Sequence, residues 1–286
     1  MSQASAPQAD PVLTLVSEAN EDPRRLYYLW EQQRWEAGKV DLTSDSAEWT
    51  EVDPQLRAAV SDAVAWRRLR AEWATTALVP FVDVAPQEEQ QVFLTTQLVD
   101  EARHLVFFDR VLGEVIEVGG DTIADRRGLM DDDSLRLLLD DVLPGSVREL
   151  RVGGVDPGPL VRAVTAYHLV TLGALGLTGQ RALDRYLSEN DALPGIRTGL
   201  ELEARDARRH VAFALVLLTQ TVGRDRLLAR TSTEAVAVTL PLVRSALGSA
   251  GSVAPTVYAG DDLAEEAESA LDRWFAAVGL ERSVRS

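Results

Sequence analysis

The chain has 286 residues, of which 46% are hydrophobic and 26% are charged, a composition typical of a globular protein with a sizeable core. Its formal net charge of -16 argues against a nucleic-acid binder, because such a protein needs a basic surface. The absence of cysteine excludes disulfides, thiolate metal sites and cysteine nucleophiles.

The first 22 residues are polar and rich in Ala, Pro and Gln, so we expect a flexible tail over 1–22 and a single domain over 23–286. The N-terminal segment lacks the basic and apolar regions of a signal peptide, and no apolar run approaches the roughly 20 residues of a membrane span. We therefore expect a cytoplasmic protein without a nucleic-acid or membrane partner. Residues 23–49 are rich in Tyr and Trp, which predicts a short helix and an extended arm packed over the domain.

Four long segments with the helical spacing of apolar residues follow, separated by breaks that contain Pro and Gly. They cover residues 54–82, 87–118, 159–188 and 194–222. A shorter helix is expected over 132–143, ended by Pro144 and Gly145, and two more over 233–247 and 262–278. No segment has the period of a strand, so the pattern predicts an all-α protein, a four-helix bundle with additional helices.

Glu101 and His104 lie three residues apart within an apolar stripe of the second long segment, so both side chains should share one helix face. A Glu-x-x-His pair on the inward face of a bundle helix is typical of a carboxylate-bridged metal centre. The first long segment adds Glu72 among apolar neighbours. The alternative for Glu72 is an ion pair with a nearby arginine.

The fourth long segment repeats part of this pattern. Asp100, Arg103 and His104 correspond to Asp206, Arg209 and His210, 106 residues later. A metal-bound histidine usually donates its second N–H to a carboxylate. We therefore expect Asp206 to orient His104 and Asp100 to orient His210 across the bundle. Two ordinary surface clusters of ion pairs are the alternative.

Together these motifs resemble one family, the ribonucleotide reductase small-subunit-like branch of the ferritin-like superfamily, and within it most closely the ligand-binding oxidases with an iron or manganese centre. The resemblance spans about residues 25–222. It rests on Tyr28-Leu-Trp30-Glu-x-x-x-Trp35, Leu94-Thr-Thr-x-x-x-Asp100-Glu101-Ala-Arg-His104, Tyr167-His168-Leu-Val and Ala204-Arg-Asp-x-x-Arg-His210-Val-Ala-Phe.

The resemblance implies metal ligands at Glu72, Glu101, His104 and His210, with Asp100 and Asp206 behind them. Two carboxylates that the family carries are missing, because Leu172 and Ala207 stand at their positions.

The resemblance also bears on two tyrosines. The radical tyrosine of the reductases corresponds to Phe108, so an active reductase subunit is not expected. Tyr167 corresponds to a tyrosine that the oxidases crosslink and is the candidate catalytic residue, although Thr75 replaces its valine partner.

The loss of two carboxylates empties one side of the implied centre, so we expect one Fe or Mn ion rather than two. Glu203 lies four residues before Ala207 on the same helix face and could replace a lost ligand. A salt bridge with Arg162 or Arg205 is its alternative. Gly173, Gly176 and Gly179 indicate either close helix contact or space for an elongated ligand beside Leu172.

Two functional hypotheses remain at this stage. The first is an oxidoreductase with a mononuclear or altered dinuclear Fe or Mn site that activates O2 against a small, apolar substrate, and we expect it to be a homodimer. The second is a metal-free, degenerate relative that acts as a binding or partner subunit. A ferritin-type iron store fits less well, because the aromatic N-terminal arm is typical of the reductase-like branch.

Overall fold

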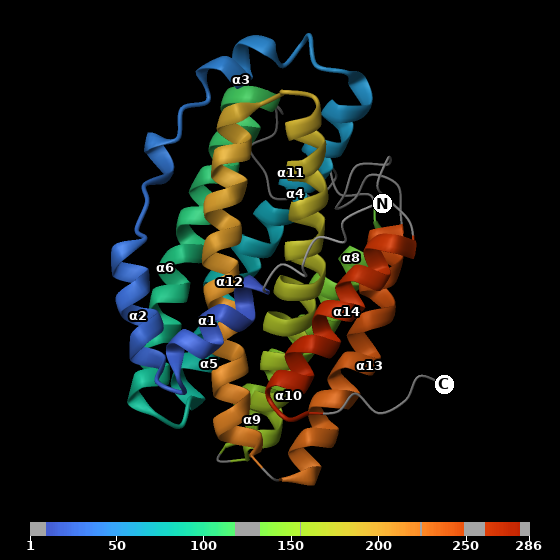
Figure 1. The fold of residues 1–286 in the computed structure, drawn as a ribbon. Helices are drawn as coiled ribbons and strands as arrows, with labels where there is room; N and C mark the ends of the chain where they lie inside the picture. The colour runs from blue at the N-terminus through green and yellow to red at the C-terminus, as the bar shows by residue number, and fades with distance from the viewer. Residues whose placement is uncertain (1–9, 118–131, 155, 224, 249–260, 281–286) are drawn as a thin grey trace, which may run out of the picture.

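The computed structural model describes residues 10–117, 132–154, 156–223, 225–248 and 261–280. Every regular element among them is helical, and long helices run side by side along the molecule (Figure 1). The all-α prediction is confirmed.

The first two long segments form an antiparallel pair. Helix α4 (Pro54–Ala77) begins where the Asp53 carboxylate accepts hydrogen bonds from the backbone N–H groups of Gln55 and Leu56, a typical N-cap. The chain continues through the short α5 (Val79–Val84) and returns as α6 (Glu88–Val111), which ends in the turn η2 (Leu112–Ile116). Both segments thus match the predicted ranges within a few residues where the structure describes them.

The third long segment is one continuous helical stretch made of α10 (Pro157–Val164), η4 (Thr165–Leu177) and α11 (Thr178–Glu189). Its middle part, η4, is a π-helix of 13 residues. Long π-helical stretches are rare and often mark functional sites. The stretch is long and apolar enough to cross a membrane, but 89% of its apolar window is buried inside the protein, so it is the core helix of the bundle.

The fourth long segment, α12 (Pro194–Val222), has the predicted bounds. Asp45 fixes its start, because its carboxylate accepts hydrogen bonds from the backbone N–H groups of Gly195 (2.9 Å) and Ile196 (2.7 Å). Asp45 belongs to α3 (Thr43–Glu48), part of the N-terminal arm. The arm therefore holds the end of the bundle at which α12 begins.

The shorter predicted helix is longer than expected. It comprises α8 (Asp133–Leu137), η3 (Leu138–Val142) and α9 (Leu143–Val152), so the predicted end at Pro144 and Gly145 is wrong. Pro144 stands in the first turn of α9, directly after η3, and the first turn of a helix is where a residue without an N–H is tolerated. Asp132 caps the helix by accepting a hydrogen bond from the backbone N–H of Leu135 over 2.9 Å.

The N-terminal region is more ordered than predicted. A flexible tail was expected over residues 1–22, but part of that range forms the helix α1 (Pro11–Ala19). This helix packs on α12 and buries Val12 and Ala19. The arm then forms α2 (Pro23–Gln32), η1 (Ala37–Lys39) and α3, and α2 lies along α6 (Figure 1). Apolar residues spaced along α1 explain this order, since they bury a face that a free tail would expose.

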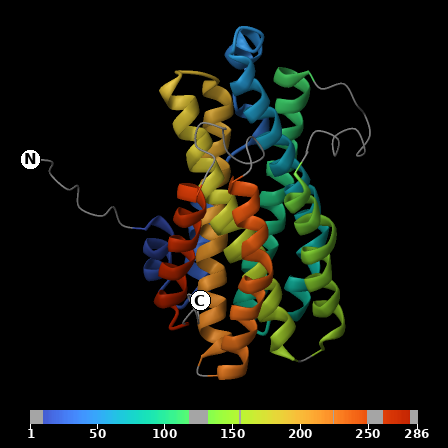
Figure 2. The same ribbon diagram turned by 90° about the vertical axis from the view of Figure 1, so that its right-hand side faces the viewer.

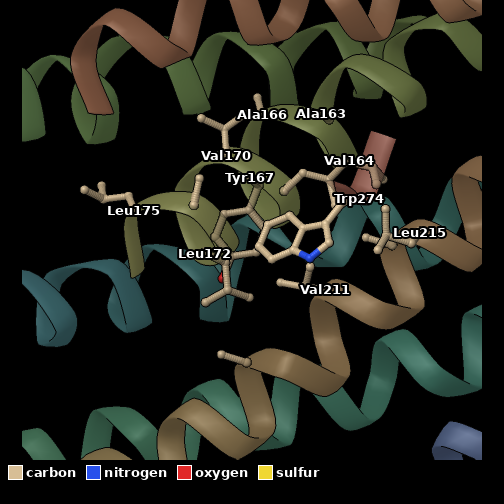
Figure 3. Packing of buried hydrophobic residues seen from close by; sticks show 14 of the residues in the cluster. Ala163, Val164, Ala166, Tyr167, Val170, Leu172, Leu175, Val211, Leu215 and Trp274 are labelled. Atoms are coloured by element: carbon tan, nitrogen blue, oxygen red, sulfur yellow. The ribbon is translucent and has the colours of Figure 1, made fainter. Parts of the chain in front are cut away.

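The C-terminal helices α13 (Arg226–Gly248) and α14 (Asp261–Ala277) lie side by side on the bundle (Figure 2). The indole of Trp274 on α14 inserts against η4, where a Cβ atom at Gly173 would lie 2.6 Å from the ring. Figure 3 shows this indole between Tyr167 and Leu172 on one side and Val211 and Leu215 on the other. Gly173 therefore serves close helix contact, and the indole fills the space beside Leu172 that could have held a ligand.

Candidate functional site

The paired Asp and His residues meet in the centre of the bundle. His104 Nε2 on α6 lies 3.2 Å from Asp206 Oδ2 on α12, and His210 Nε2 on α12 lies 2.9 Å from Asp100 Oδ2 on α6. All four side chains are buried. These are the two crossed contacts that the repeated motif predicts.

The arginine of each motif ties the two pairs into one network. Arg209 Nη2 donates to Asp100 Oδ2 over 2.7 Å and to Asp206 Oδ1 over 2.8 Å. Arg103 Nη1 donates to Asp100 Oδ1 over 2.8 Å. The two motifs therefore form a single buried ion-pair network rather than two surface clusters.

Two tryptophans of the N-terminal arm complete this network. Trp30 Nε1 donates to Asp100 Oδ1 and Trp35 Nε1 to Asp206 Oδ2, each over 2.8 Å. The aromatic residues of the arm predicted that it packs on the bundle. The pattern did not identify Trp30 and Trp35 as hydrogen-bond donors to the two aspartates. Each aspartate thus accepts from a histidine, an arginine and an indole.

An arginine lies on the other side of His104. Arg70 on α4 is 1% exposed, and its Nη1 donates to both carboxylate oxygens of Glu101 over 3.1 Å and to the Tyr167 hydroxyl over 3.2 Å. The Tyr167 hydroxyl in turn donates to Glu101 Oε1 over 2.9 Å. The guanidinium of Arg70 therefore occupies the point at which α4, α6 and η4 meet.

Glu203 on α12 also faces this arginine. Its Oε1 accepts from Arg70 Nη2 over 2.9 Å, and its Oε2 lies 3.6 Å from Nε of the buried Arg67. Glu203 is 5% exposed. It lies at the centre, as its helix position suggested, but it pairs with the arginines of α4 and not with Arg162 or Arg205.

Glu72 lies away from this centre, which corrects the expectation that it is a metal ligand. Its side chain is 29% exposed and forms an ion pair with Arg68 on the same helix. Two residues along a helix turn the side-chain direction by about 200°, so Arg70 and Glu72 point to nearly opposite sides of α4. The side chain of α4 that faces Glu101 is therefore a cation.

Because Arg70 rather than Glu72 faces the centre, the residue of α4 beside Tyr167 also differs from the one expected. The indole of Trp73 packs against the Tyr167 ring with a centroid separation of 5.0 Å, whereas the Thr75 hydroxyl bonds to the backbone carbonyl of Glu72. Leu172 and Ala207, at the positions of the missing carboxylates, are buried in the core. The side chains of α4 that contact Tyr167 are therefore the Trp73 ring and the Arg70 guanidinium.

The charge on His104 follows from its two partners. Burial alone would lower the pKa of His104, but hydrogen bonds to Asp206 and Glu101 and their negative charges raise it to about 10. Its Nδ1 lies 3.3 Å from Glu101 Oε2. Both ring nitrogens of a protonated histidine carry hydrogen, so a metal ion would have to displace one of these protons to bind.

Glu101 is held as a carboxylate. Burial would raise its pKa, but the charge of Arg70 and the hydrogen bond from His104 hold the pKa well below its usual range. The pKa of the Tyr167 hydroxyl is raised well above its usual value, because the hydroxyl is buried and lies beside the negative charge of Glu101. Tyr167 therefore stays protonated at neutral pH.

The other two histidines have fewer charged partners than His104. Burial lowers the pKa of His168 to about 3, and its Nε2 lies 3.0 Å from Oε1 of Gln97. His210 uses Nε2 for Asp100, while its buried Nδ1 has no hydrogen-bond partner. A buried nitrogen without a partner is rare, so Nδ1 of His210 is an unused polar atom inside the bundle.

These residues do not fit a bound Fe or Mn ion as they stand. Within the part of the chain that the structure describes, no three His, Asp or Glu side chains converge on a point that could hold a metal. The four buried carboxylates are already neutralised by Arg67, Arg70, Arg103, Arg209 and a protonated His104. A divalent cation would add buried charge without a counter-ion, which is costly.

Comparison with known proteins supports the fold. Neither models of known protein families nor curated protein sequences gave a match. Among solved structures, the chain is similar to an R2-like ligand-binding oxidase from Sulfolobus acidocaldarius, with 20% identity, a TM-score of 0.75 and coverage of 100% of this chain and 99% of that one.

Another similar structure is a tyrosine-to-phenylalanine variant of an R2-like ligand-binding oxidase with an aerobically reconstituted Mn/Fe cofactor, with 17% identity, a TM-score of 0.72 and coverage of 97% and 98%. A glycine-to-leucine variant with an anaerobically reconstituted Mn/Fe cofactor has 18% identity, a TM-score of 0.71 and coverage of 96% and 95%. The part of the chain that the structure describes therefore has the ferritin-like helical fold of the R2-like ligand-binding oxidases, the family that its paired motifs resemble.

Proposed function

We propose that the chain is a metal-independent relative of the R2-like ligand-binding oxidases and acts as a binding or partner subunit, not as an O2-activating enzyme. The observation that carries this proposal is the position of Arg70, whose guanidinium bonds to Glu101, Glu203 and the Tyr167 hydroxyl. A guanidinium is always charged and has no lone pair to offer a metal. It supplies inside the protein the positive charge that a metal ion would bring.

Metal analysis of the purified wild-type chain after aerobic loading with Fe(II) and Mn(II) tests this proposal. We expect far less than one ion per chain, and no change in the midpoint of thermal unfolding with either metal. One tightly bound ion per chain, lost in Glu101→Ala, would overturn the proposal and favour the oxidase hypothesis. Two ions, with one lost in Glu203→Ala, would assign Glu203 as a ligand.

The oxidase remains a second candidate because of one observation, the free Nδ1 of His210. In that case one Fe or Mn ion would displace Arg70 from Glu101, and the ligands would be Glu101, His104 and His210, with Asp100 and Asp206 orienting the histidines. Glu72 has no part in this set, since it lies on the opposite side of α4. Oxygen uptake by the metal-loaded chain would distinguish the two candidates, because the preferred one predicts none.

A homodimer is part of the proposal, and the outer face of α6 is its interface. Val92, Val99 and Val106 lie seven residues apart and are 40%, 50% and 52% exposed. Thr95 and Ala102 are exposed between them. Valine is a poorer helix former than alanine, so an exposed valine stripe in a chain with net charge -16 suggests a contact surface.

The spacing of the valines suits a two-fold axis. In an antiparallel arrangement centred on Val99, Val92 of one copy meets Val106 of the other, as an interface between identical chains requires. Val79 at the start of α5 is also exposed, at 53%. We place this homodimer in the cytoplasm.

A small-molecule ligand also remains part of the proposal. A pocket of about 310 Å³ opens between α9, η4 and α13 and reaches Ala166, the residue before Tyr167. Val142, Ala235 and Val238 contribute apolar surface to the pocket. Its charged lining residues are of both signs, Asp141, Glu149, Arg148 and Arg162, and Arg162 pairs with Glu149 over 3.0 Å. This composition suits a small amphipathic molecule.

A further inference from the structure

The pocket between α9, η4 and α13 lies outside the buried ion-pair network. Helix α10 packs on both α9 and α13, so α10 and the start of η4 form the floor of the space between those two helices. The wall formed by η3 and α9 consists of residues three or four apart, which share one helix face. These are Asp141, Val142, Gly145, Ser146, Arg148 and Glu149.

The four charged residues of the pocket fall into two groups. Arg162 on α10 pairs with Glu149 over 3.0 Å, so these two charges already offset each other. Asp141 and Arg148 have no ion-pair partner among the residues that the structure describes. The pocket therefore offers a ligand one free carboxylate and one free guanidinium.

Gly145 lies between these two charges on the helix. Asp141 precedes it by four residues and Arg148 follows it by three. A Cβ atom at Gly145 would lie 3.7 Å from Nη2 of Arg148, so the guanidinium bends back along the helix over Gly145, toward the end of the pocket that carries Asp141. The two charges are not within ion-pair distance of each other, and a ligand that carries both signs can stand between them.

The rest of the lining is apolar or has already spent its hydrogen-bond donors. The hydroxyl of Ser146 donates to the backbone carbonyl of Leu143 over 2.8 Å, and that of Thr239 donates to the carbonyl of Ala235 over 2.8 Å. Apolar surface comes from Val142, Ala166, Ala235 and Val238. The free charges of opposite sign thus adjoin a surface that suits an apolar group.

We infer that this pocket binds a small zwitterion with an apolar side chain, of the class of the free aliphatic and aromatic α-amino acids. The ammonium group would pair with Asp141 and the carboxylate with Arg148, while the side chain packs on the apolar lining. A simple acid or a simple amine would leave one of the two protein charges without a partner. This inference rests on the small-molecule ligand of the proposed function and names its chemical class.

Three probes of the same carbon skeleton test the inference by isothermal titration calorimetry. L-leucine carries both charges, isocaproate lacks the ammonium group and isoamylamine lacks the carboxylate. We expect one L-leucine per chain, bound at least about fivefold more tightly than either of the other two. L-leucine should also raise the midpoint of thermal unfolding, because it binds the native state.

Two substitutions assign the charges to the ligand. Arg148→Gln and Asp141→Asn should each weaken L-leucine binding by about fivefold. Arg148→Gln should not weaken isoamylamine binding, and Asp141→Asn should not weaken isocaproate binding. Arg151→Gln is the matched control on α9, since Arg151 is exposed and does not line the pocket, and it should leave all three affinities unchanged. Circular dichroism checks that each variant is folded.

Several results would overturn the inference. The wild type might bind no L-leucine and no L-phenylalanine, or bind the three probes with equal affinity; the second result would leave the small-molecule ligand of the proposed function intact. L-leucine binding that both substitutions leave unchanged would place the site elsewhere. Metal bound by the wild type would overturn the proposed metal independence instead, and the titrations in metal-free buffer would still decide the inference.

Discussion

Arg70 on α4 donates to both oxygens of Glu101 on α6 over 3.1 Å, and neither side chain is more than 1% exposed. The two residues lie 31 positions apart and connect the antiparallel helices at mid-height. Tyr167 and Glu203 join the pair from the other two long helices. This contact therefore stabilises all four helices of the bundle and determines the charge at its centre.

Replacing either Arg70 or Glu101 alone should lower the free energy of unfolding. Glu101→Gln leaves the buried Arg70 without its closest counter-charge, so we expect unfolding in urea to show a loss of about 3–5 kcal/mol. The double variant Arg70→Met/Glu101→Gln should lose less free energy of unfolding than the two single variants lose in sum, because it leaves no unpaired arginine at position 70. Additive losses would mean that the two side chains are not coupled.

A surface pair provides the control for this experiment. Arg185 and Glu189 form an ion pair on α11 with both side chains more than half exposed. Glu189→Gln should therefore change the free energy of unfolding by less than about 1 kcal/mol.

The stability of the protein should depend on pH through His104. Its pKa is raised from the ordinary value of 6.5 to about 10, so the folded state retains a proton that the unfolded chain releases. This stabilisation is complete below pH 6.5 and is lost as the pH rises through about 10. Between these values the free energy of unfolding should fall by up to about 1.4 kcal/mol per pH unit.

The measurement is urea unfolding from pH 6 to 10, with His104→Gln as the control, which should lose this dependence. The chain has three histidines, so side-chain NMR can follow each of them. A His104 ring that titrates near its ordinary pKa in the folded protein would contradict the prediction.

The close contact between η4 and α14 predicts that a single methyl group added at Gly173 lowers the stability of the protein. In Gly173→Ala the new Cβ would lie 2.6 Å from the Trp274 ring, so the variant should lose about 1–3 kcal/mol of stability through overpacking. Gly176→Ala is the matched control in the same π-helix, because the nearest atom, the backbone oxygen of Thr171, lies 3.4 Å from the added Cβ. Urea unfolding should separate the two variants, and equal losses would rule out the indole as the cause.

If the exposed valines of α6, Val92, Val99 and Val106, form the dimer interface, one charge placed among them should break the dimer. Val99→Glu places a carboxylate at the centre of the stripe and should convert the dimer into a monomer, since two such charges would face each other across the two-fold axis. Val152→Glu, at a valine of α9 that is 83% exposed, should leave the dimer intact. Light scattering after gel filtration measures both, and a wild-type monomer or a dimeric Val99→Glu variant would contradict the assignment.

The fold could be predicted because its signals are local. Proline and glycine breaks and apolar periodicity placed the long helices. The repeated Asp, Arg and His motif predicted contacts between α6 and α12, because inward faces of neighbouring bundle helices must meet. The N-terminal helix α1 was missed, since its order comes from packing on α12 rather than from its polar composition.

The sequence by itself determined that Asp100 and His104 share one face of a long helix and that Asp206 and His210 share a face of another, because helical periodicity and the repeated motif place each pair together. The tertiary structure alone decided which residue of α4 faces Glu101. Glu72 and Arg70 are two positions apart, and the residues around both are mixed in polarity, so helix period alone does not select between them. Packing against α6 and α12 turned Arg70 inward and Glu72 outward, because the four carboxylates at the centre need a buried cation.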